Sequence, residues 1–193
     1  MPNIEEQKQK FLALCRDNIH RDGLEELLGW LEKSDFFTAP ASTRFHGAYE
    51  GGLCEHSLDV YDMALKGANG FGLILDAESI AIAALFHDLC KVNFYKPDTR
   101  NQKINGVWTV VPCYTVEEKF AFGGHGSKSV FLVQQFMKLK TDEAAAINSH
   151  MGAFPGGDAV RDSANAYEAF FLAWLIHAAD EAATYLLERK GQQ

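Results

Sequence analysis

Histidines and aspartates recur in parts of this chain that are otherwise apolar. His87 and Asp88 follow the apolar run 80–86, and His177 and Asp180 lie one helical turn apart in a second apolar stretch. An unpaired ion buried in such a segment would cost several kcal/mol. These side chains therefore need a compensating partner, and a shared cation would satisfy them together.

Three further histidines extend this pattern. His56 lies on the apolar stripe of a predicted helix, while His125 opens one predicted helix and His150 closes another. Each histidine taken singly is as well explained by a core imidazole bonded to a backbone carbonyl. Together, four predicted helices place His or Asp on inward faces, which favours a metal site. Mixed nitrogen and oxygen donors suit divalent Mn, Fe, Co, Ni or Zn better than Ca.

The elements that must position these side chains are mostly helical. Helical spacing of apolar residues predicts helices over 4–17, 22–33, 51–66, 78–90, 127–138, 141–150 and 164–188. Asn105-Gly106, a type I′ turn signal between basic, β-branched and aromatic residues, predicts a β-hairpin inserted at about 93–116. The hairpin's aromatic and basic residues suit either a nucleotide lid or an aromatic cluster packed on the helices.

Composition limits the classes of protein to consider. The 193 residues, 47% of them hydrophobic and 23% charged, fit one compact domain. A net charge of -8 disfavours binding to duplex DNA. Every apolar run is shorter than the roughly 18 to 20 residues that span a bilayer. The N-terminus lacks a secretory pattern and the four cysteines lack metal-knuckle spacing, so we expect a cytoplasmic protein with reduced thiols and treat Cys54 and Cys90 as small core residues.

Five phrases in order carry a family resemblance. HGAYEGGLCEHS, ALFHDLCK, GHGSKSV, INSHMG and IHAADE resemble the HD superfamily of metal-dependent phosphohydrolases. Within it they are similar to the 3′-to-5′ exoribonuclease HD proteins and to small uncharacterised HD proteins. The resemblance implies an all-α HD-domain helical bundle over 38–188. The predicted helices of 1–34 would pack on this bundle, making 1–193 a single HD domain.

The resemblance also assigns metal ligands. It implies that His56, His87, Asp88 and Asp180 hold one divalent transition metal ion. His125 and His150 would hold a second ion, with Asp88 bridging the two. Related binuclear proteins often have a further histidine directly after the one matching His150, where this chain has Met151. The second ion is therefore the less securely assigned of the two.

The implied activity is hydrolysis of a phosphate ester of a nucleotide or short oligonucleotide by attack of metal-bound hydroxide, as a monoesterase or a diesterase. Asp88 and Lys91 are the candidate catalytic residues, because Lys91 would lie on nearly the same helical face and resembles the lysine of HDxxK phrases. Arg44, His46 and Lys128 are candidates for binding the substrate phosphate.

Simpler roles for these polar residues also fit the sequence. Lys128 is equally well described as a surface lysine and His46 as an anchor for its loop, whereas a solvated helix-end lysine is the less favoured description of Lys91. A different class of function is a non-catalytic HD sensor module that binds a metal or a nucleotide without turnover. The complete ligand set and the presence of Lys91 favour the enzyme.

Overall fold

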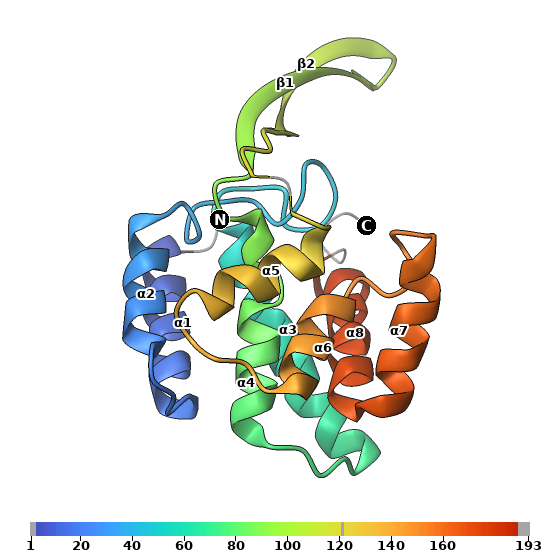
Figure 1. Ribbon diagram of the computed structural model, residues 1–193. Helices are drawn as coiled ribbons and strands as arrows, with labels where there is room; N and C mark the ends of the chain where they lie inside the picture. The colour runs from blue at the N-terminus through green and yellow to red at the C-terminus, as the bar shows by residue number, and fades with distance from the viewer. Residues whose placement is uncertain (1–2, 121, 189–193) are drawn as a thin grey trace.

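The computed structural model describes residues 3–120 and 122–188, a helical body from which a two-stranded ribbon projects (Figure 1). The all-α class with one inserted hairpin is confirmed. No helix of the described ranges is long and apolar enough to cross a bilayer. The helices are α1 (Ile4–Asn18), α2 (Leu24–Lys33), α3 (Gly52–Phe71), α4 (Ala77–Phe86), α5 (His125–Gln134), α6 (Thr141–Ser149), α7 (Asp158–Ala169) and α8 (Phe171–Ala182).

Helix α4 forms the centre of the core. Its residues from Ser79 to Phe86 are all buried, because it contacts α1, α3, α6 and α8. A helix that is apolar all round is expected in such a surrounded position. The α1 side chain of Phe11 reaches it, with ring centroids of Phe11 and Phe86 6.1 Å apart. The two N-terminal helices thus extend the core of the helices that follow.

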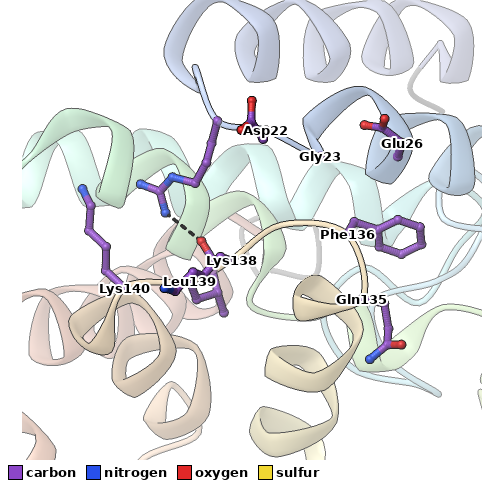
Figure 2. A pocket seen from close by; sticks show the side chains of 9 residues that line it. Asp22, Gly23, Glu26, Gln135, Phe136, Lys138, Leu139 and Lys140 are labelled. Atoms are coloured by element: carbon purple, nitrogen blue, oxygen red, sulfur yellow. Dashed lines mark hydrogen bonds between the residues drawn. The ribbon is translucent and has the colours of Figure 1, made fainter.

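An arginine in the loop between α1 and α2 ties that loop to the body. Arg21 pairs with Glu143 at 2.6 Å and with Glu78 at 2.8 Å. It also donates a hydrogen bond to the carbonyl of Lys138 at 3.3 Å, which is the dashed line in Figure 2. The side chains drawn in Figure 2 line a cavity of about 920 Å³ beside this junction. None of the candidate site residues named above lines that cavity.

The hairpin consists of β1 (Tyr95–Ile104) and β2 (Val107–Val116), close to its predicted bounds. Asn105 and Gly106 both have positive φ, as a type I′ turn requires. The aromatic residues divide between its two ends. Trp108 near the tip is 70% exposed, whereas Phe94 just before the base is buried and contacts the ring of His125, with centroids 5.6 Å apart. The packed aromatic cluster is therefore confirmed at the base of the ribbon and wrong for its outer part, whereas the nucleotide lid stays a prediction.

The single predicted helix over 164–188 is wrong. The chain leaves α7 at Phe170, whose extended backbone (φ -138, ψ 109) separates α7 from α8, and α7 itself begins six residues earlier than predicted. This break lets α7 pack against α6 and α8, where the hydroxyl of Ser163 donates to the carbonyl of Gly152 at 2.9 Å. Apolar periodicity continues through the break, so the sequence carries no local signal for it.

Candidate metal centre

The turn after α4 presents His87 and Asp88. The predicted helix over 78–90 ends early, because α4 stops at Phe86 and Asp88 leaves the helical conformation (φ -108, ψ 22). A 3₁₀ turn over Leu89–Lys91 follows. Residues three apart eclipse in such a turn, so Nζ of Lys91 still lies 2.6 Å from Oδ2 of Asp88. Both side chains are buried, which excludes the solvated alternative for Lys91.

Side chains from the α4 turn and α8 converge around Nε2 of His56 on α3. Nε2 of His56 lies 3.2 Å from Nε2 of His87, 3.2 Å from Oδ1 of Asp180 and 3.6 Å from Oδ2 of Asp88. Nδ1 of His87 bonds to the carbonyl of Ala84 at 2.8 Å. A carbonyl only accepts, so Nδ1 carries the proton and Nε2 presents its lone pair to the group.

The other oxygen of Asp88 faces a different set of donors. Oδ1 lies 3.5 Å from Nε2 of His150 and 3.8 Å from Sγ of Cys90, which is itself 3.5 Å from Nδ1 of His125. Nδ1 of His150 donates to the carbonyl of Ile147 at 2.7 Å. Nε2 of His150 is buried and has no hydrogen-bond partner within the described residues. Such an orphaned buried nitrogen fits a cation ligand.

A residue that the sequence did not single out supports the first group. Oε1 of Glu188 lies 2.7 Å from Nδ1 of His56, and its side chain is 4% exposed. A π-helical turn over Ala183–Leu187 connects it to α8. A carboxylate on the second nitrogen of a ligand histidine commonly orients that ring. The sequence separation of 132 between the partners leaves no local signal for this contact.

The charges of the cluster favour a divalent cation. Three carboxylates, Asp88, Asp180 and Glu188, face one ammonium group, Lys91, which leaves two negative charges for protonated histidines or a bound cation to balance. Burial opposes ionisation of Asp88, yet Lys91 and the nearby histidines hold its pKa well below the usual range. Burial likewise opposes protonation of His56, but Asp180 and Glu188 raise its pKa to about 10. A protonated His56 thus balances part of the negative charge of these carboxylates, which a bound cation would otherwise balance.

His46 and Arg44 come from the same loop before α3, but only His46 lies within the cluster. The ring of His46 is 5.0 Å from that of His56, and burial lowers its pKa to about 4, so it is neutral near pH 7. Arg44 is exposed over the ring of Phe45 and lines a cavity of about 230 Å³ together with Glu188. The structure thus brings His46 into the cluster and leaves Arg44 at its edge.

Lys128 does not occupy its alternative surface setting, whereas His177 has the simple role of an imidazole bonded to a backbone carbonyl. Lys128 is buried and pairs with Glu118 at 2.8 Å, so it is not a surface lysine. It lines a cavity of about 170 Å³ with Cys90 and His125. His177, one turn before Asp180 on α8, bonds instead to the backbone carbonyl of His150 at 2.7 Å.

The family model for the HD domain matches residues 53–185. The chain belongs to the HD domain family. Its resemblance to the HD phosphohydrolases is therefore confirmed, together with the HD fold and membership of a family of metal-dependent phosphohydrolase enzymes. The buried His and Asp groups of this HD-domain protein are consistent with a metal site.

This HD-domain protein is also similar to one curated protein. Dihydroneopterin 2′,3′-cyclic phosphate phosphodiesterase of Methanocaldococcus jannaschii is 42% identical to it over 57 residues. That match covers 28% of this chain and 23% of the archaeal protein, so the chain spans about a quarter of that relative's length. No solved structure matches the chain.

Proposed function

We propose that this HD-domain protein is a metal-dependent phosphohydrolase that cleaves a phosphate ester of a nucleotide or a similar small molecule. We also propose that residues 1–193 form a single domain and that the protein acts in the cytoplasm. One observation carries it. The two oxygens of the buried Asp88 face different donors, Oδ2 facing Nε2 of His56 and Oδ1 facing Nε2 of His150 and Sγ of Cys90, in a cluster with surplus negative charge.

In this proposal His56, His87, Asp88 and Asp180 hold one divalent ion, and His125, His150 and Asp88 hold a second. Two observations support these ligand roles. Nε2 of His87 and Nε2 of His150 each present a lone pair, and Nε2 of His150 has no hydrogen-bond partner among the described residues. Bound divalent ions of the Mn, Fe, Co, Ni or Zn type polarise phosphoryl oxygens and lower the pKa of a coordinated water.

Lys91 and three further side chains in or beside the cluster act on the substrate. The Lys91 ammonium, held beside Asp88, neutralises charge that develops on a phosphate oxygen or the leaving group. His46 donates to the phosphate as a neutral imidazole, and Arg44 contacts it from the adjacent cavity. Lys128 contacts the phosphate from the other side, in competition with its partner Glu118.

A small substrate fits better than a long oligonucleotide. The two cavities beside the cluster measure about 230 and 170 Å³, and the chain is acidic overall. The archaeal relative acts, by its name, on a cyclic phosphate of a pterin. Small cyclic phosphodiesters with a nucleotide-like ring are therefore the first substrates to test.

The decisive variant is Asp88→Ala. We expect it to lose bound metal and turnover together, because Asp88 is the oxygen donor shared by both groups. Metal content is measured by elemental analysis, and turnover on 2′,3′-cyclic nucleotides, nucleoside phosphates and bis(p-nitrophenyl) phosphate with added Mn. Asp62→Ala, at an exposed position of α3, is the matched control.

Two outcomes would reject the proposed enzyme. Unchanged activity in Asp88→Ala would show that the cluster is not the catalytic centre. Bound metal in the unaltered protein with no product from any of these substrates would instead support the non-catalytic binding module.

A further inference from the structure

The geometry points to Cys90 as a direct thiolate ligand of the second ion, beside His125, His150 and Asp88. This inference rests on the proposed metal centre and changes the role expected for Cys90, a small core residue by sequence. It also assigns the second ion a softer donor set than the first, whose proposed ligands are imidazole and carboxylate groups.

The distances around the sulfur match those of a tetrahedral site. Metal–sulfur bonds of about 2.3 Å and metal–nitrogen or metal–oxygen bonds of about 2.0–2.2 Å, at the tetrahedral angle, separate the donor atoms by about 3.6 Å. Sγ of Cys90 lies 3.5 Å from Nδ1 of His125 and 3.8 Å from Oδ1 of Asp88. The sulfur is thus already within coordination spacing of two proposed ligands.

A second feature points independently to a ligand at this place. Nε2 of His150 is buried, has no hydrogen-bond partner among the described residues and lies 3.5 Å from the same Oδ1 of Asp88. The Nδ1–H bond to the Ile147 carbonyl leaves that nitrogen as a lone-pair donor. Ligand atoms of Asp88, Cys90 and His125 thus lie within 4.8 Å of one another, and Nε2 of His150 approaches this group through the same Oδ1 of Asp88.

The backbone holds the thiol close to His125. The N–H of Cys90 donates to the hydroxyl of Ser129 at 3.0 Å, and Ser129 is fully buried one turn after His125 on α5. Cys90 and His125 also line the same cavity of about 170 Å³. An ion that binds there displaces the thiol proton to solvent, and the sulfur favours Zn, Fe or Co over Mn or Mg.

Anaerobic titration of the metal-free, full-length protein with Co²⁺ tests this ligand directly. A thiolate bound to Co²⁺ gives a near-ultraviolet charge-transfer band that nitrogen and oxygen donors alone do not give. We expect this band in the unaltered protein and its loss in Cys90→Ser. The affinity for that ion should fall about tenfold or more in the variant. Cys113→Ser, on the hairpin, should keep the band.

The outcomes separate this inference from the proposed function. Cobalt bound by the unaltered protein without the band would reject Cys90 as a ligand and leave the phosphohydrolase standing. The test on the unaltered protein remains valid even if Cys90→Ser fails to fold. Persistence of the band in a folded Cys90→Ser protein would also reject Cys90 as a ligand. If the unaltered protein binds no divalent ion, both the Cys90 ligand and the proposed phosphohydrolase are rejected.

Discussion

His56 and Glu188 form a buried contact across most of the chain, with Nδ1 of the histidine 2.7 Å from Oε1 of the carboxylate. When Nδ1 donates to the carboxylate, Nε2 is left to face Asp88 and Asp180. The contact therefore sets both the orientation and the tautomer of the α3 histidine. It makes Glu188 a positioning residue for the first proposed ion.

We expect Glu188→Ala to weaken binding of the first ion by roughly 10- to 100-fold, because the His56 ring loses its orienting partner. Glu188→Gln, which keeps an acceptor oxygen but loses the charge, should cost less. Calorimetric titration of metal-free protein with Mn²⁺ measures both. Glu181→Ala, at an exposed site on α8, is the control, and equal affinities in all four proteins would contradict the positioning role.

Lys91→Met should lower kcat by about 10²- to 10³-fold with little loss of bound metal, because methionine fills the buried space but carries no charge to place on a phosphate oxygen. Turnover of a cyclic nucleotide and metal content, measured on the same metal-loaded preparation, check this. A loss of metal in proportion to the loss of turnover would mean that Lys91 only supports Asp88.

Gly126 lets α5 approach the end of α6, since a Cβ at this position would overlap the carbonyl of Asn148. Gly126→Ala should therefore destabilise the fold by about 1–3 kcal/mol and weaken the second ion by moving His125 away from His150. Gly29→Ala in α2, where a Cβ meets open space, should instead stabilise it by about 0.5–1 kcal/mol. Urea unfolding and metal titration measure both variants, and equal stabilities would contradict the packing explanation.

The contacts of Glu78 with His20 and Arg21 make the unfolding free energy of this protein sensitive to acid. The backbone N–H of His20, and then Arg21, lower the pKa of Glu78 below its usual 4.5. A carboxyl whose pKa is lower in the folded state contributes stability above the unfolded value and loses it as the pH falls. The unfolding free energy of Glu78→Gln should therefore differ most from that of the unaltered protein above pH 4.5 and converge with it below. Urea titrations from about pH 7 to about pH 3 test this, and a difference that does not change with pH would refute it.

Local patterns in the sequence were enough for much of the architecture. Apolar spacing predicted six of the helices near their observed places, and Asn105-Gly106 predicted the hairpin, because these signals lie within one turn or one face of an element. The same spacing failed at Phe170, where packing of α7 against α8 ends a helix that periodicity alone would continue. It also failed after Phe86, where the helix gives way to the turn that carries Asp88.

The sequence by itself identified side chains that are too polar for their apolar segments, and from them it predicted a shared cation for His56, His87, Asp88, His150 and Asp180. Only the tertiary structure decided how the donors are grouped, with one oxygen of Asp88 toward His56 and the other toward His150 and Cys90. It alone brought Glu188 to His56. The physical reason is that a local pattern encodes which face of a helix is buried, whereas distances between helices depend on how α3, α4, α6 and α8 pack together.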